Sequence, residues 1–154
     1  MDDRHFPLFV SSYGKRAVIF GGGNIGERRV ETLLKFSFSV TVVSPSLTEK
    51  LAERAEAGEI QYIADCYKAD YLEGSYLVIA CTDDRQTNRE IGEAAKAREL
   101  HVSVCDRREE CTFFFPAVAV NDEVTVGIVG SGKTHRVTRR AAVRLREIVE
   151  RKAY

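Results

Sequence analysis

The sequence predicts an α/β fold: a Rossmann-like, doubly wound parallel sheet followed by a C-terminal strand–strand–helix appendage. Up to Cys105, short apolar runs alternate with helical patterns, which is typical of a parallel sheet covered on both faces. After Cys105, only the turn-like segment 121–123 separates two apolar runs, and one helical pattern follows. A strand pair that leaves a compact domain often pairs with another chain. We therefore expect a first domain over 1–115 and a dimerisation segment over 116–154.

Each predicted element has its own local signature. Short apolar runs predict strands over 16–20, 40–43, 60–63, 76–81 and 101–105. Helical periodicity predicts helices over 24–35, 47–58 and 84–100, and Gly58 suits the C-cap of the second helix. In the appendage we expect a hairpin from 112–120 and 124–129 and a helix over 137–152. The apolar face of that helix is predicted to hold Val137, Ala141, Leu145, Ile148 and Val149.

Length, composition and charge fit one globular domain with a small appendage. The chain has 154 residues, of which 44% are hydrophobic and 30% charged, so it can bury a core. Lys plus Arg and Asp plus Glu both number 23, which favours neither nucleic acid nor a membrane as a partner. The sequence contains neither an apolar run that could cross a bilayer nor a signal-peptide core. We therefore expect a cytoplasmic protein.

The cysteines and histidines show no metal-ligand spacing. No C-x-x-C pair is formed by the four cysteines, Cys66, Cys81, Cys105 and Cys111, and three of them lie in or beside predicted strands. We expect structural thiols in a reducing compartment. The three histidines are scattered along the chain, so no metal site is predicted.

The segment "GGGNIG" at 21–26 has the G-x-G-x-x-G spacing of dinucleotide-binding loops. It follows the first predicted strand and leads into the first predicted helix, which is the context that the motif requires. Gly21 would form the tight turn, Gly23 would let a pyrophosphate approach the backbone, and Gly26 would allow close packing of the helix. The helix N-terminus adds amides and a positive dipole end. The pattern favours a dinucleotide such as NAD over a purely structural turn.

The end of the second predicted strand leaves the type of dinucleotide open. An Asp or Glu commonly ends this strand and binds the ribose hydroxyls, but here Val43 is followed by Ser44 and Pro45. No arginine stands at this point to favour a 2′-phosphate. Both NAD and NADP are compatible with the sequence.

A second glycine-rich string, "GIVGSGKT" at 127–134, fits the Walker A pattern. Its context disagrees, because Gly127 falls inside a predicted hairpin strand. A P-loop needs a preceding parallel strand and further strands that supply the aspartate for magnesium. We interpret the string as an anion-friendly turn that contains Lys133. A small nucleoside triphosphatase is the weakest alternative function.

Over nearly its whole length, the chain resembles the precorrin-2 dehydrogenase module of siroheme synthases. The resemblance rests on strings that occur in the family's order: "FPLFV", "GGGNIGERRVETLL", "VTVVSP", "YLVIACTDDRQTN", "VSVCD" and "FFFPAVAV". A glycine-rich turn with a lysine then precedes the last helix. Members of this family oxidise precorrin-2, a reduced tetrapyrrole rich in carboxylates, to sirohydrochlorin by hydride transfer to NAD. Some members also insert ferrous iron to make sirohaem.

The resemblance implies roles for particular residues. Asp106 matches the aspartate that closes the strand before the appendage, and is implied as the catalytic residue. Contacts to NAD are implied for residues that join Gly21 of the glycine motif: Gly23, Asn24, Ile25, Ser44, Pro45 and Thr82. The resemblance also implies a homodimer formed through the segment after Asp106, and precorrin-2 as the substrate.

The chemistry of the residues agrees with these roles. Four residues that each follow a predicted strand should line the ligand-binding edge of the sheet: Gly21, Ser44, Thr82 and Asp106. Loss of hydride from carbon is accompanied by loss of a proton from a neighbouring atom, and a carboxylate can accept that proton. A turn cap is the alternative role for Asp106. Asp83 and Asp84 are expected to cap the following helix.

Several basic residues are candidates for binding the carboxylates of the substrate. A substrate rich in carboxylates would favour a field of arginines, and Arg107 and Arg108 directly follow Asp106. The last predicted helix carries further arginines, which either bind substrate carboxylates or form a solvated helix face. They are Arg136, Arg139, Arg140, Arg144, Arg146 and Arg151. Family members usually continue with a helical segment past the point that matches residue 154. The main alternative function is a non-catalytic NAD-binding sensor, or a subunit that needs a partner.

Overall fold

The computed structural model describes residues 5–132 and 135–150. The chain divides into two compact units, and each is described by itself. The larger unit is Ser12–Phe113. The smaller unit combines the residues up to Ser11 with those from Phe114 onward, a grouping that the sequence did not indicate.

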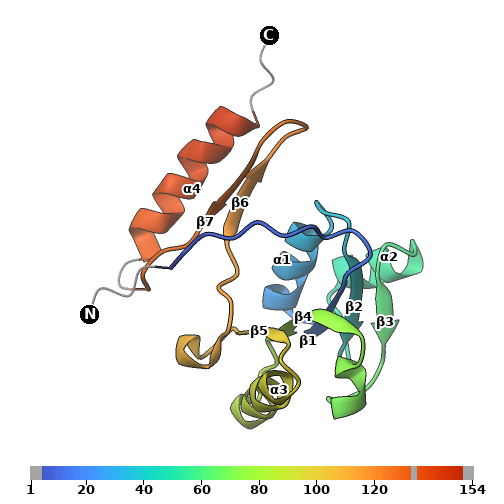
Figure 1. The fold of residues 1–154 in the computed structure, drawn as a ribbon. Coiled ribbons are helices and arrows are strands. Elements are labelled where there is room, and N and C mark those ends of the chain that lie inside the picture. Colours follow the sequence, from blue (N-terminus) through green and yellow to red (C-terminus); the bar gives the residue numbers. More distant parts are fainter. Residues whose placement is uncertain (1–4, 133–134, 151–154) are drawn as a thin grey trace. The chain divides into compact units, whose positions relative to one another are not determined.

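The larger unit is built on a five-stranded sheet in the order β3-β2-β1-β4-β5, and all of its strand pairs are parallel (Figure 1). The strands are β1 Arg16–Phe20, β2 Ser39–Val43, β3 Gln61–Ile63, β4 Ser75–Ala80 and β5 His101–Val104. The helices are α1 Asn24–Leu33, α2 Glu49–Glu56 and α3 Arg85–Ala97, with short 3-10 turns η1 Ala69–Leu72 and η2 Arg108–Glu110. The predicted doubly wound α/β fold is confirmed. The order reverses between β1 and β4, and in such sheets ligands bind at this switch point.

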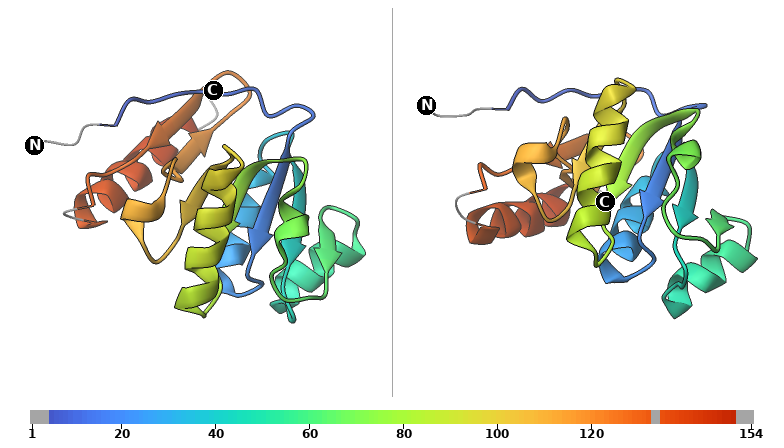
Figure 2. Two further views of the ribbon diagram at one scale, coloured as in Figure 1. Left: turned by 60° about the horizontal axis from the view of Figure 1, so that its bottom comes forward. Right: turned by 90° about the horizontal axis from the view of Figure 1, so that it is seen from below.

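Apolar side chains fill both faces of this sheet. On one face Val18 and Val78 pack in a fully buried cluster with Ile91 and Ala95 of α3. Ile19, which points to the opposite face by strand alternation, is also fully buried. In Figure 2, α3 lies on one side of the sheet and α1 on the other. The near-continuous apolar strands follow from this double coverage.

Side chains and glycines set the helix ends of this unit. Thr48 caps α2, because its hydroxyl accepts a hydrogen bond from the amide of Leu51. Asp84 caps α3, because its carboxylate accepts a hydrogen bond from the amide of Thr87 at 2.6 Å. Of the two aspartates that were predicted to cap this helix, Asp84 is therefore the N-cap. Gly58 follows α2 with a φ of +73°. Its amide donates to the carbonyl of Ala55 at 3.1 Å, so Gly58 terminates the helix one residue after the C-cap, which is Ala57 rather than the predicted Gly58.

The smaller unit has the predicted strand–strand–helix order. Strands β6 (Ala117–Val120) and β7 (Thr125–Ile128) pair antiparallel, and α4 spans His135–Val149. The guanidinium of Arg146 donates from Nε to the carbonyl of Val118 at 2.9 Å, and the side-chain amide of Asn121 donates to the carbonyl of Val149 at 2.8 Å. These bonds join α4 to the hairpin.

Two residues of the predicted apolar face of the last helix are exposed. Val137 and Ile148 are 66% and 70% exposed, whereas Ala142 and Val149 are buried. The hairpin lies against a face of α4 turned away from Val137 and Ile148, and residue periodicity could not specify that direction. In the described part of the chain, no helix is both long enough and apolar enough to traverse a bilayer.

Candidate functional site

The carboxyl ends of four strands bring the predicted site residues to one edge of the sheet. Gly21, Ser44, Thr82 and Asp106 each follow a strand end of the parallel sheet within two residues. Backbone bonds extend the sheet slightly past the strands, because the amide of Gly21 donates to the carbonyl of Val43 at 3.0 Å. All four residues belong to the larger unit.

Two glycines of the motif are required by the backbone itself. Gly21 has a φ of +123°, and a Cβ there would lie 2.4 Å from the carbonyl oxygen of Cys81. A Cβ on Gly26 would lie 2.1 Å from the carbonyl oxygen of Gly21. Any side chain at either position would push α1 or the turn out of place. These two glycines therefore shape the loop.

Gly22 is a third structural glycine, which the sequence analysis did not assign. A Cβ there would lie 2.2 Å from the carbonyl oxygen of Ser46. The carbonyl of Gly22 also accepts a hydrogen bond from the amide of Thr48 at 2.9 Å. The loop after β2 thus packs directly on the glycine loop, and the only sequence signal for this was the third glycine in the run.

Gly23 differs from its neighbours because the space around it is open. A Cβ built on Gly23 meets nothing within 4 Å. Gly23 is the N-cap of α1, and no side chain caps this helix, although Thr48 and Asp84 cap α2 and α3. The first amides of a helix lack intrahelical partners. The geometry therefore suits the approach of a pyrophosphate to the uncapped end of α1.

The first turn of α1 and the end of β2 supply the other predicted cofactor contacts. Asn24 and Ile25 are exposed, and Ile25 keeps 50% of its surface accessible. Ser44 is buried and its carbonyl accepts from the Tyr62 hydroxyl at 3.0 Å, whereas Pro45 is exposed. Neither residue carries a charge that would select between a ribose hydroxyl and a 2′-phosphate.

Glu27 in the first turn of α1 ties the glycine loop to the start of α2. Its carboxylate accepts from the Thr48 hydroxyl at 2.6 Å and pairs with Lys50 at 3.2 Å. The Thr48 hydrogen bond lowers the pKa of Glu27, and Lys50 adds to this effect. The negative charge also lies at the favourable end of the helix dipole. Sequence reasoning missed this link because the partners are 21 residues apart.

Asn88 of α3 connects two of the predicted site residues. Its Oδ1 accepts from the amide and the hydroxyl of Thr82 at 3.0 and 2.7 Å. Its Nδ2 donates to the carbonyl of Thr82 at 3.0 Å and to Oδ2 of Asp106 at 3.2 Å. The backbone of Thr82 fixes the orientation of this amide, and Asn88 is only 1% exposed. Asn88 is thus a buried bridge from β4 to the carboxylate after β5.

Asp106 is held by side chains of α3. Oδ1 accepts from Arg85 at 3.3 Å, and the same guanidinium pairs with Glu110 of η2. The hydrogen bond to Glu110, followed by the charge of Asp106, raises the pKa of Arg85 despite partial desolvation. The Asp106 side chain is 38% exposed. Its carboxylate is oriented by Asn88 and Arg85, which differs from the turn-cap geometry considered above.

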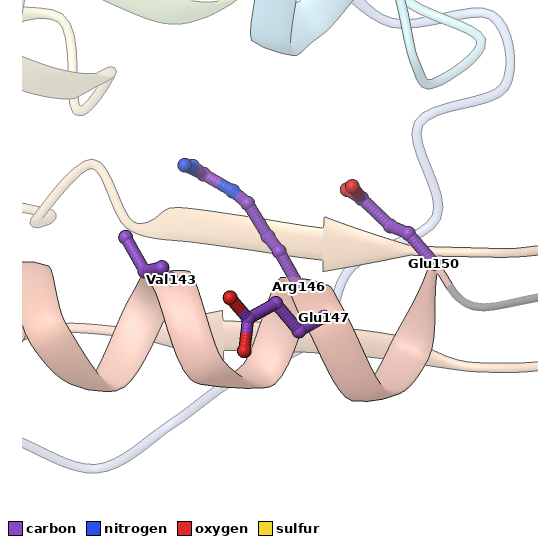
Figure 3. Close-up of a pocket in the computed structure, with 4 residues that line it drawn as sticks. All are labelled: Val143, Arg146, Glu147 and Glu150. Atoms are coloured by element: carbon purple, nitrogen blue, oxygen red, sulfur yellow. The ribbon is translucent and has the colours of Figure 1, made fainter.

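The other candidate features lie elsewhere. Gly127 falls in β7 opposite Val118, so the Walker-like string does not follow a parallel strand, and Lys133 and Thr134 lie outside the described residues. Figure 3 shows a surface pocket on α4 lined by Val143, Arg146, Glu147 and Glu150, none of which belongs to the predicted site. Among the described residues, no three His, Cys, Asp or Glu side chains cluster as metal ligands would.

The sheet order and the glycine loop define a Rossmann-like dinucleotide-binding protein. The chain belongs to the family described as "Putative NAD(P)-binding", whose model matches residues 8–117. This membership confirms the predicted type of cofactor, a nicotinamide dinucleotide.

Curated relatives agree with the resemblance to siroheme synthases. The chain is 38% identical over 144 residues to the "Probable multifunctional siroheme biosynthesis protein HemA" of Ruminiclostridium josui. It is 35% identical over 129 residues to the siroheme synthase of Photorhabdus laumondii subsp. laumondii. These alignments cover 93% and 84% of this chain, but it spans only 28% and 27% of the relatives. The resemblance noted from the sequence is confirmed.

A solved structure supports the fold. The chain is similar to a protein described as "SirC, precorrin-2 dehydrogenase", with a TM-score of 0.78 and 19% sequence identity. The similarity covers 94% of this chain and 71% of that one. At this level of identity, the comparison bears on the architecture alone.

Proposed function

We propose that this chain is an NAD-dependent dehydrogenase that oxidises precorrin-2 to sirohydrochlorin in sirohaem biosynthesis. The observation that carries the proposal is the carboxylate of Asp106 at the ligand-binding edge of the sheet, oriented by Asn88 and Arg85. The names of the relatives, a siroheme biosynthesis protein and a siroheme synthase, support this choice of pathway and substrate.

The residues of the glycine loop fit NAD. The open space at Gly23 and the uncapped amides of α1 suit its pyrophosphate, and Asn24 and Ile25 flank that position. Ser44, Pro45 and Thr82 follow the neighbouring strands and complete the proposed contacts. When bound there, NAD supplies the hydride acceptor of the reaction.

Asp106 accepts the proton in this proposal. Oxidation of a carbon–carbon or carbon–nitrogen unit removes a hydride from one atom and a proton from its neighbour. A partly exposed carboxylate can reach substrate and take that proton. Arg85 donates to Oδ1 of the carboxylate, and Asn88 fixes the direction of Oδ2. Asp106 thus acts as the general base.

The test compares oxidation with cofactor binding. Enzymatically made precorrin-2 and NAD are supplied without oxygen, and sirohydrochlorin is followed by absorbance. Asp106→Asn should lower turnover by about 10²–10⁴-fold, the range for a lost general base. NAD affinity, measured by calorimetry, should stay near that of the native chain. Asp122→Asn, an isosteric change in the exposed hairpin turn, is the matched control and should retain full turnover.

Three other outcomes overturn parts of the proposal. Loss of NAD binding together with turnover in Asp106→Asn would indicate a structural cap. NAD binding without oxidation by the native chain would favour a sensor or a partner-dependent subunit. Heat of binding with ATP alone would favour a triphosphatase that uses the turn at Lys133. Iron insertion is a separate activity, measured with sirohydrochlorin and ferrous iron.

We also propose that residues 116–154 form a homodimer while residues 1–115 bind cofactor and substrate. Large apolar side chains of the smaller unit support this division. Eleven such residues are exposed in the described chain, and five of them lie within 116–154: Val124, Val129, Val137, Val143 and Ile148. Four more, Phe6, Leu8, Phe9 and Val10, belong to the same compact unit although they precede residue 116. A surface this apolar commonly marks an interface. A two-stranded ribbon with one helix has little core of its own, which a second copy would supply.

A further inference from the structure

Two cysteines face each other at the carboxyl ends of β4 and β5. Ala80 and Val104 are partners in the parallel ladder, so Cys81 and Cys105 are the next pair along the two strands. The pairing continues to this point, because the amide of Cys105 donates to the carbonyl of Ala80 at 2.9 Å. Paired residues of parallel strands point to the same face. The side chains of Cys81 and Cys105 therefore lie at neighbouring positions on one face of the sheet.

The surroundings make the two thiols unequal. Cys81 is buried, whereas Cys105 is partly exposed. The neighbouring Cys81 side chain and Arg29 of α1 together outweigh desolvation and lower the pKa of Cys105 to about 7. The same contact and burial raise the pKa of Cys81. Cys105 is therefore the nucleophile of the pair, and Cys81 is positioned as the resolving thiol.

Cys81 also contacts the glycine loop. Its Sγ lies 3.8 Å from the carbonyl oxygen of Gly21, to which the thiol donates a weak hydrogen bond. A Cβ on Gly21 would lie 3.1 Å from this sulfur, and one on Gly26 3.6 Å from it. The sulfur therefore packs directly beneath the turn that precedes α1. A change in the position or bonding of this sulfur would therefore alter the packing of the glycine loop.

We propose that Cys81 and Cys105 are a reactive dithiol that closes to a disulfide with hydrogen peroxide and thereby weakens dinucleotide binding at the glycine loop. The Cys105 thiolate attacks one peroxide oxygen, which forms an S–O bond, breaks the O–O bond and releases water after protonation. The Cys81 sulfur then attacks the sulfenic sulfur, forms the S–S bond and displaces a second water. The two thiols lose two electrons in total, and the peroxide gains them.

Disulfide formation alters the support of the glycine loop. The Cys81 thiol loses its hydrogen, so the carbonyl of Gly21 loses this donor. The sulfur must also move to about 2.05 Å from its partner, the bonding distance of a disulfide. Loss of one weak bond and of packing under the turn should weaken NAD binding by about 3- to 10-fold. This readout depends on the proposed cofactor site, whereas the disulfide itself does not.

The experiment uses the full chain, reduced first and then treated with stoichiometric peroxide. Peptide mapping by mass spectrometry should find a Cys81–Cys105 disulfide, and dithiothreitol should reverse it. NAD affinity by calorimetry should fall on oxidation and recover on reduction. Cys105→Ser should abolish both responses. Cys66→Ser, which alters an exposed cysteine after β3, should respond as the native chain does.

Specific results would overturn the inference. Oxidation only at Cys66, a disulfide between Cys105 and Cys111, or over-oxidation of Cys105 without a disulfide would exclude the pair. A mapped Cys81–Cys105 disulfide with unchanged NAD affinity would exclude the control of binding. If the reduced chain does not bind NAD, the proposed function fails by itself, and thermal melting of the reduced and oxidised chains then measures the coupling to the loop. Identical melting curves would refute that coupling.

Discussion

The side-chain amide of Asn88 donates to Oδ2 of Asp106 at 3.2 Å, while the backbone of Thr82 fixes which way that amide points. The amide oxygen of Asn88 is occupied by the amide and the hydroxyl of Thr82, so only its nitrogen is free to face Asp106. One buried side chain thus sets the geometry of the strand end after β4 and of the carboxylate after β5. Asn88 is a positioning residue for the proposed base.

The first prediction separates positioning from folding. Asn88→Asp keeps the shape of the side chain but places a second carboxylate beside Asp106. Neighbouring carboxylates resist joint ionisation. The acid limb of the pH–rate profile should therefore move to higher pH, since the base must be ionised to work. The measurement is the rate of precorrin-2 oxidation from about pH 5 to about pH 9, which covers the expected shift of the acid limb.

A control distinguishes this effect from loss of structure. Asn88→Ala leaves the amide and carbonyl of Thr82 without their partner and should cost about 1–3 kcal/mol of stability. It should lower turnover without moving the pH profile, because no charge is added. Equal profiles for both variants would contradict a positioning role.

The second prediction uses two glycines of one loop. Gly23→Leu should abolish NAD binding in a folded chain, because its Cβ is free of protein contacts but points into the space proposed for pyrophosphate. Gly26→Ala should destabilise the chain, because its Cβ would lie 2.1 Å from the carbonyl of Gly21. Thermal melting and calorimetry measure the two effects. NAD affinity that survives Gly23→Leu would rule out this loop as the cofactor site.

The third prediction concerns stability in acid. Asp65 accepts hydrogen bonds from Lys68 and from the Tyr71 hydroxyl, and these bonds lower its pKa to about 2. A carboxyl whose pKa is depressed by folding stabilises the native state above its unfolded pKa, and this contribution disappears as pH falls through the folded pKa. The contribution of Asp65 should thus decline between about pH 4 and about pH 2.

Asp65→Asn tests this assignment directly. The difference in melting temperature between the native chain and Asp65→Asn should be largest near neutral pH and vanish near pH 2. Asp70→Asn, a change in the neighbouring turn, serves as the comparison. A difference that stays constant with pH would show that the loss comes from packing rather than from the carboxylate's charge.

Local patterns account for what the sequence predicted well. The five strands depend on contiguous apolar runs, and the glycine loop depends on a spacing of a few residues. Both could therefore be predicted from the sequence alone. Gly21 and Gly23 also occupy distinct environments, one crowded and one open, as the spacing of the motif suggested. Their roles in binding NAD stay predictions.

Contacts between distant segments were not predictable in the same way. Arg85 donates to Asp106, which lies 21 residues later in the chain. Cys81 and Cys105 are neighbours because of the register between β4 and β5. A single sequence does not specify this register. The exposure of Val137 and Ile148 was not predictable for a similar reason, since periodicity defines a stripe on a helix but not the direction from which the hairpin packs.

The last prediction concerns the dimer. Ile148 and Val137 are 70% and 66% exposed on α4, in the unit that carries most of the exposed apolar surface. If a second copy covers this face, Val137→Asp with Ile148→Asp buries two charges at the interface and should shift the chain to monomer in sedimentation at micromolar concentration. Tyr13→Asp is the matched control, because Tyr13 is 86% exposed in the larger unit and its replacement should leave the dimer intact. A native chain that sediments as a monomer would refute the dimer itself. A dimer that survives the double substitution would instead exclude this face of α4 and move the interface to the hairpin or to the exposed apolar residues 6–10.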